Sequence, residues 1–129
     1  MKLKNHYYIM RHGQAKSNVK SIVSSWPEKF NNPLTKKGVS EIKKAAGKLK
    51  GKNINFIFAS PLLRTRETAE IVGKVIGVKP KIDKRLREID FGTFNYKPVE
   101  EFGKYFKINN IKARIKEKTP GGENCHSFY

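Results

Sequence analysis

Four side chains in this 129-residue sequence have types and positions suited to phosphoryl chemistry. Arg11 and His12 adjoin each other and precede Gly13, Arg64 lies near the start of a later apolar stretch, and Glu88 lies in a polar one. An arginine binds phosphate through two parallel N–H···O bonds, and two arginines neutralise charge that develops during transfer. They also lower the pKa of a neighbouring imidazole, because like charges disfavour its protonated form.

A neutral imidazole is a nucleophile, so the pattern predicts that His12 accepts a phosphoryl group as a covalent intermediate. Glu88 would protonate the departing alkoxide and then help to activate water. Taken singly, each residue has a plainer interpretation: a structural histidine, a solvated Glu88, a Ser60 that only caps a helix, or an Arg64 paired with Glu67. Only the joint pattern favours catalysis.

The elements that must position these groups begin with residues 6–10, which are aromatic, β-branched or apolar. They predict a short buried strand that ends on Arg-His-Gly, and active groups of open α/β sheets lie at the carboxyl ends of strands. Residues 16–24 have apolar positions at helical spacing. The amino end of that helix would face the Arg-His-Gly turn and form an anion site.

The remaining elements alternate between strand and helix. A second helix is predicted after the N-cap Thr35, ending at Gly51, and a second strand over residues 54–59. Ser60-Pro61 starts a third helix that ends at Gly77, and residues 79–82 form a third strand. Short helices are expected around residues 99–106 and 108–115, a polar loop over 86–92 and a break over 119–123. This order predicts one α/β domain over residues 1–129 with a mostly parallel sheet.

Composition limits the possible partners. The formal charge of +17 favours anionic ligands, but the lysines are spread over the chain, and no nucleic-acid motif appears, so a solvated basic surface is favoured over a nucleic-acid face. No apolar run is long enough to span a bilayer, and the first residues lack the apolar segment of a signal peptide. The single cysteine, Cys125, excludes an internal disulfide framework. We expect a cytoplasmic protein without a membrane partner.

Five segments resemble, in order, those of the histidine phosphatase superfamily, in its phosphoglycerate-mutase-like branch. They are Tyr8-Ile9-Met10-Arg11-His12-Gly13 through Asn18, Pro33-Leu34-Thr35 with Gly38, residues 60–69, Leu86-Arg87-Glu88 with Gly92, and Pro120-Gly121-Gly122-Glu123. RHG alone would be a weak signal, whereas five ordered segments are a strong one.

The resemblance implies that His12 is the phosphorylated nucleophile, that Arg11 and Arg64 hold the phosphate, and that Glu88 is the proton donor. It implies that Asn18 helps to bind the transferring group. It also implies a three-layer α/β/α, phosphoglycerate-mutase-like fold, a small phosphorylated substrate, and chemistry without a metal or other cofactor.

The sequence departs from the family in one respect. Family members carry a second histidine, in a strand some way after the segment that resembles residues 120–123, and this chain ends before that point. His6 and His126 fit that position poorly. We therefore expect a chain that lacks a C-terminal strand and helix. It should be marginally stable, because the missing strand would lie beside the first one. It should also be poorly active towards p-nitrophenyl phosphate, because one donor to the phosphoryl oxygens is absent.

Three functions are compatible with these residues. A phosphomonoester hydrolase is favoured. A mutase uses the same chemistry, but mutases of this family resemble one another in a Trp before the Asn of the first helix, and Lys16-Ser17-Asn18 has none. The third is a catalytically weakened module that binds phosphate or RNA, which the basic charge and the missing histidine would favour.

Overall fold

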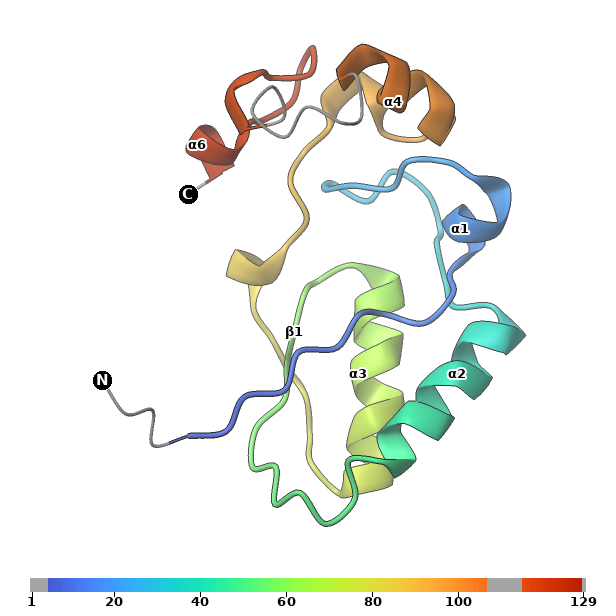
Figure 1. The fold of residues 1–129 in the computed structure, drawn as a ribbon, viewed down its shortest axis with the longest axis vertical. Helices are drawn as coiled ribbons and strands as arrows, with labels where there is room; N and C mark the ends of the chain where they lie inside the picture. Colours follow the sequence, from blue (N-terminus) through green and yellow to red (C-terminus); the bar gives the residue numbers. More distant parts are fainter. Residues whose placement is uncertain (1–4, 107–114, 129) are drawn as a thin grey trace.

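The structure is a computed structural model that describes residues 5–106 and 115–128. In chain order, its elements are α1 (Lys16–Lys20), α2 (Lys36–Gly47), β1 (Phe58–Ala59), α3 (Leu63–Ile76), β2 (Lys81–Ile82), the 3-10 helices η1 (Lys84–Leu86) and η2 (Gly92–Phe94), α4 (Val99–Phe106) and α6 (Cys125–Phe128) (Figure 1). None of the helices in these ranges is long and apolar enough to cross a membrane.

A parallel strand pair and two packed helices form the larger part of the fold. β1 pairs with β2 in register Phe58 to Lys81 and Ala59 to Ile82, and α3 connects the two strands. This is a βαβ unit, as the predicted order of elements required. α2 packs against α3 through a core of Ile42, Ala46 and Val72. The α/β class and the parallel pairing are therefore confirmed.

The prediction of a buried first strand over residues 6–10 is wrong. No strand is assigned there, and the segment is exposed, with Tyr7 71% and Ile9 100% accessible. Within the described residues, the sheet consists of β1 and β2 alone. Apolar side chains at alternating positions are buried only when a neighbouring strand or layer covers them, and nothing described covers this segment.

Several element boundaries differ from the predictions. α1 ends at Lys20 instead of residue 24, α2 ends at Gly47 instead of Gly51, and β1 and β2 are each two residues long. Two predicted ends are confirmed. The Thr35 hydroxyl accepts a hydrogen bond from Gly38 N at 3.0 Å, and Gly77 closes α3 in the left-handed region, at φ 77°.

α3 begins differently from the prediction. Its first helical residue is Leu63, and the Ser60 side chain does not cap it. Ser60 Oγ instead accepts from Leu62 N at 3.4 Å. The carboxylate of Glu28, from a distant loop, accepts from Leu63 N at 2.9 and 3.3 Å. A charged acceptor at a helix amino end is favourable, so tertiary structure replaces the local cap.

α4 and the segment 115–128 form a smaller lobe that the loop after η1 joins to the rest of the fold (Figure 1). α4 confirms the helix predicted around residues 99–106, whereas most of the helix predicted at 108–115 lies outside the described residues, and α6 was not predicted. Phe91, Phe94, Phe102 and Phe106 pack with ring centroids 4.6–5.7 Å apart. This aromatic cluster packs α4 against residues 91–94.

Candidate active site

His12 and Arg64 are in direct contact. Nε of Arg64 donates a hydrogen bond to Nε2 of His12 at 3.1 Å, and Nδ1 of the same ring lies 2.7 Å from the carbonyl oxygen of Gly13. A guanidinium nitrogen only donates, so Nε2 must accept with its lone pair, and Nδ1 must carry the proton that it donates to Gly13. The contacts therefore assign the neutral imidazole, with Nε2 facing Arg64.

The surroundings of His12 favour this neutral form. Burial lowers the pKa of the imidazole most, and the positive charges of Arg64 and Arg11 lower it further, whereas the hydrogen bond to Gly13 raises it. The net effect lowers the pKa of His12 below 6.5, so the ring is unprotonated at neutral pH and its Nε2 lone pair accepts the hydrogen bond from Arg64.

Arg64 is held by neutral groups, and no carboxylate of the described residues is hydrogen-bonded to it. Its side chain is 5% exposed, and its Nη1 and Nη2 donate to Ser24 Oγ at 2.8 Å and to Ser24 O at 3.2 Å. The predicted alternative, an Arg64–Glu67 ion pair, is wrong, because Glu67 Oε2 accepts from Leu34 N at 2.6 Å instead. A buried guanidinium without a bonded carboxylate is a strong attractor for an anion.

The buried side-chain amide of Asn32 is hydrogen-bonded to Ser24. Asn32 is 0% exposed, and its Nδ2 donates to Ser24 Oγ at 3.0 Å and to Ser17 Oγ at 2.9 Å, while its Oδ1 accepts from Ser17 N at 2.8 Å. The chain Asn32–Ser24–Arg64 therefore fixes the guanidinium against His12. Sequence reasoning missed both Ser24 and Asn32, because nothing in Asn31-Asn32-Pro33 distinguishes this amide from ordinary loop residues.

The turn after His12 is held by α2 and α3. Gly13 N donates to Thr68 Oγ1 on α3 at 3.3 Å, and Thr35 N donates to Gln14 O at 2.9 Å. The first turn of α2 approaches so closely that a Cβ on Gly13 would lie 2.6 Å from Gly38 O, and a Cβ on Gly38 would collide with Gln14 O. Glycine at both positions is thus required for the packing that places His12.

Arg11 and Glu88 are the other predicted catalytic residues, and their charges act on the His12–Arg64 pair in different ways. Arg11 is exposed, and its charge reaches both His12 and Arg64. Burial lowers the pKa of Arg64 most; the charges of Glu88 and then Glu28 oppose this effect, and Arg11 adds to it. The charge of Arg11 therefore acts on both His12 and Arg64, whereas the charges of Glu88 and Glu28 act on Arg64. Glu28 was not indicated by the sequence.

Asn18 has a local partner. Its Oδ1 accepts from Ala15 N at 2.8 Å, so the side chain folds back on the first turn of α1 and is otherwise exposed. The substrate-binding role of Asn18 stays a prediction. His6 and His126 are both exposed, and neither is among the hydrogen-bond partners of His12 or Arg64.

The loop that carries Glu88 is held by the turn 119–123. Nη1 and Nη2 of Arg87 donate to the two carboxylate oxygens of Glu123 at 2.8 and 2.7 Å, and Asp90 N donates to Glu123 Oε2 at 2.9 Å. Side-chain hydrogen bonding raises the pKa of Arg87 and lowers that of Glu123. Glu88 itself remains exposed, with Oε1 accepting from Ile89 N at 3.0 Å.

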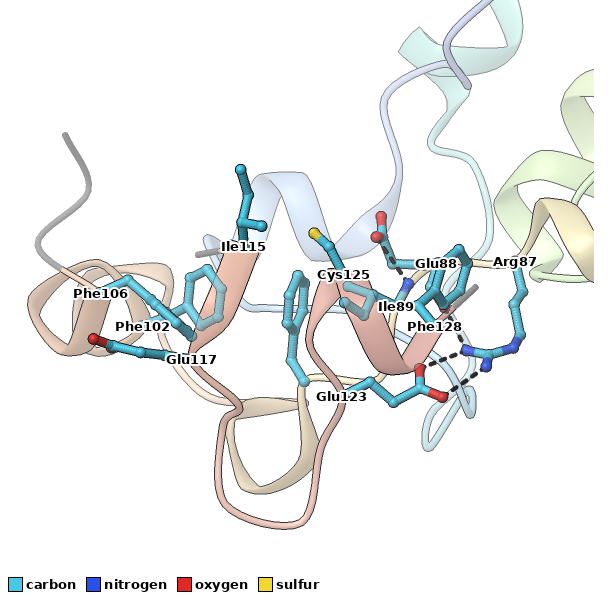
Figure 2. A pocket seen from close by; sticks show the side chains of 11 residues that line it. Arg87, Glu88, Ile89, Phe102, Phe106, Ile115, Glu117, Glu123, Cys125 and Phe128 are labelled. Carbon is cyan, nitrogen blue, oxygen red and sulfur yellow. Dashed lines mark hydrogen bonds and ion pairs between the residues drawn. The ribbon is translucent and has the colours of Figure 1, made fainter. Parts of the chain in front are cut away.

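A cavity of about 370 Å³ lies against this loop. Figure 2 shows Glu88 and the Arg87–Glu123 pair on one side of it and the aromatic rings of α4 on the other. Among residues 5–106 and 115–128, no three histidine, cysteine, aspartate or glutamate side chains are grouped so that they could hold a metal ion.

Comparison with known proteins identifies the family. A family model described as the histidine phosphatase superfamily (branch 1) matches residues 7–129. The chain is 34% identical over 109 residues to the 2,3-bisphosphoglycerate-dependent phosphoglycerate mutase of Thermoplasma acidophilum, covering 84% of this chain and 54% of that protein. It is 30% identical over 115 residues to the probable phosphoglycerate mutase GpmB of Photorhabdus laumondii, covering 89% and 51%. The chain therefore spans about half the length of these curated relatives.

Solved structures show the same fold. A protein from Thermus thermophilus superposes with a TM-score of 0.70 at 29% identity, over 92% of this chain and 63% of that chain. A mycobacterial glucosyl-3-phosphoglycerate phosphatase superposes with a TM-score of 0.75 at 24% identity, over 91% of this chain and 56% of that chain, and this likeness bears on the fold alone. The predicted phosphoglycerate-mutase-like α/β fold is confirmed, and because the family model covers residues 7–129, the chain belongs to the histidine phosphatase superfamily.

Proposed function

We propose that this site hydrolyses small phosphate monoesters through a phosphohistidine formed on His12. The observation that carries the proposal is the Arg64 Nε to His12 Nε2 hydrogen bond, because it leaves a neutral imidazole whose lone pair faces a buried guanidinium. An entering phosphate would take over Arg64 as its donor and meet Nε2 at the same place. Family membership supports phosphoryl transfer in general.

In the first half of the reaction, Nε2 of His12 attacks phosphorus and the bond from phosphorus to the ester oxygen breaks. Arg64 and Arg11 bind the phosphoryl oxygens and stabilise the charge that develops on them. Glu88, in its protonated form, gives its proton to the leaving oxygen, so the alcohol departs neutral. Nδ1–H of the phosphorylated ring keeps its bond to Gly13 O, which holds the ring in place.

In the second half, water attacks the phosphorus of phosphohistidine. The Glu88 carboxylate accepts a proton from that water, the P–N bond breaks and its electron pair returns to Nε2. Inorganic phosphate leaves, and His12 and Glu88 are restored to their starting protonation states. Asn18, on the first turn of α1, is proposed as a further contact of the transferring group.

The test is detection of the covalent intermediate. The chain is incubated with a radiolabelled phosphomonoester and quenched, and an acid-labile label should appear on His12 and be absent from His12→Ala. Glu88→Gln should slow alkyl phosphates far more than p-nitrophenyl phosphate, because nitrophenolate leaves without a proton. Absence of label together with RNA binding of steep salt dependence would instead favour a phosphate-binding or RNA-binding module.

A mutase is the second candidate, because the curated relatives are described as phosphoglycerate mutases. It would transfer the phosphoryl group from His12 to a second hydroxyl instead of water. Stimulation of phosphoglycerate isomerisation by 2,3-bisphosphoglycerate would support the mutase, and phosphate release without isomerisation would support the hydrolase. We also propose a cytoplasmic location, because a single cysteine cannot form the internal disulfides that are typical of oxidising compartments.

A further inference from the structure

The cavity beside Glu88 has an apolar wall and a charged rim. Six of its lining residues are apolar: Phe91, Phe102, Phe106, Phe128, Ile89 and Ile115. Its volume of about 370 Å³ falls in the range of small-molecule sites, which are mostly apolar with a few polar groups. Figure 2 shows the rings of Phe102 and Phe106 facing Ile115 across from Ile89 and Phe128.

The cavity is next to the group that must touch the leaving oxygen. Glu88 lines it, and the charge of Glu88 also reaches Arg64, which contacts His12. If the phosphoryl group is on His12 and the ester oxygen is at Glu88, the alcohol part of the substrate extends beyond Glu88 into the cavity. We propose that this cavity is the leaving-group pocket and that it selects phosphate monoesters of uncharged, ring-bearing alcohols.

The charges of the rim support an uncharged alcohol. Among the described residues, the cavity is lined by one cation, Arg87, and this cation is already bonded by both oxygens of Glu123. The remaining charged group of the described lining is the carboxylate of Glu117, because the proposed mechanism needs Glu88 in its neutral, protonated form when substrate binds. An alcohol that carries its own carboxylate, as phosphoglycerate does, would meet the like charge of Glu117 and find, in the described part of the chain, no lining cation that lacks a bonded carboxylate, whereas a ring would bury apolar surface against phenylalanine.

The proposal rests on the proposed function, so its test measures ligand binding in the absence of any reaction. Benzylphosphonate and 2-carboxyethylphosphonate carry the same non-hydrolysable phosphorus group and differ in the part that would enter the cavity. Calorimetric titration of the whole chain at fixed salt should give a dissociation constant about tenfold lower for benzylphosphonate. Equal affinities, or a preference for the carboxylate, would overturn the pocket.

Two variants connect this preference to the cavity. Glu117→Lys, at an exposed rim position, should bind the carboxylate ligand more tightly and reduce the ratio of affinities several-fold. Ile115→Ala should weaken benzylphosphonate alone. Phe56→Ala, an exposed aromatic outside the cavity lining, is the matched control and should leave the ratio unchanged. A ratio that neither cavity variant moves would contradict the proposal.

The two proposals fail in different ways. Ligand preference without any label on His12 would refute the phosphohistidine mechanism and leave the cavity only as a binding site for ring-bearing phosphonates. Label on His12 without ligand preference would refute the pocket and leave the hydrolase standing.

Discussion

Arg64 and His12 hold each other in one orientation: the guanidinium Nε donates to imidazole Nε2 at 3.1 Å, while the opposite ring nitrogen lies 2.7 Å from Gly13 O. Both ring nitrogens therefore have a partner, and the ring cannot rotate without losing both hydrogen bonds. In the proposed mechanism, the attacking nitrogen and the phosphate-binding group are therefore already adjacent, and phosphate would have only to displace one hydrogen bond. Preorganisation of this kind lowers the reorganisation needed at the moment of reaction.

The first prediction concerns the pH dependence of His12. Because burial and two arginines lower its pKa, the ring should remain neutral below pH 6.5, and label formation should fall only at more acidic pH. The C–H resonances of the imidazole, followed by NMR, give this pKa directly. Titration of His12 at or above 6.5 would contradict the assigned neutral form.

The same shift makes stability depend on pH. The unfolded imidazole binds a proton below about pH 6.5 and the folded one only at lower pH, so stability should decrease as pH falls from about 6.5 towards the folded pKa. Urea unfolding of the native chain and of His12→Gln at pH 7.5 and 5.5 measures this effect. The native chain should lose more stability than the variant between the two pH values.

The second prediction concerns the buried amide behind the site. Asn32→Ala removes three hydrogen bonds and leaves Ser17 N–H without its partner, so it should destabilise the fold by about 1–3 kcal/mol. It should also slow labelling of His12, because Ser24 no longer holds Arg64. Asn31→Ala, at the exposed neighbouring position, is the control and should change stability by less than about 0.5 kcal/mol.

The third prediction concerns the contact between α2 and the His12 turn. Gly38→Ala places a methyl group against the Gln14 carbonyl and should cost about 1–3 kcal/mol while displacing the turn. Gly47→Ala, in the same helix, meets no atom within 4 Å and should stabilise by about 0.5–1 kcal/mol. Thermal unfolding compares the two. Similar effects of both variants would contradict the packing described for Gly38.

The fourth prediction concerns the Arg87–Glu123 pair. Glu123→Gln removes one charge from a bidentate pair whose side chains are 22% and 24% exposed, and should cost about 1 kcal/mol near neutral pH. Because the pKa of Glu123 is lowered in the fold, the cost should be present above about pH 4.5 and vanish as pH falls through the folded pKa. Unfolding free energies of chain and variant at several pH values test this.

A surface pair supplies the control for that experiment. Lys104 and Glu100 on α4 are 75% and 77% exposed, so Glu100→Gln should cost no more than about 0.3–0.5 kcal/mol, and less at high salt. Equal effects at Glu100 and Glu123 would show that the 119–123 turn does not depend on its ion pair.

Local sequence determined several features by itself. Thr35 and Gly77 set the ends of two helices, because a hydroxyl acceptor and a residue free to adopt positive φ act on their own backbone. The ordered motifs around His12, Arg64 and Glu88 identified the family, and the spacing of apolar residues identified α2, α3 and α4. These signals are short-range and are therefore readable along the chain.

Other features of the fold and of the site depend on contacts between segments that lie far apart in the sequence. The apolar segment 6–10 reads as a buried strand, but burial requires a covering neighbour, and none of the described residues supplies one. Glu28 caps α3, and Asn32 holds Ser24 against Arg64. These contacts come from loops whose local sequences do not differ from those of ordinary polar loops. Which polar side chains become buried depends on distant segments meeting in space, and that information is not present in any local pattern.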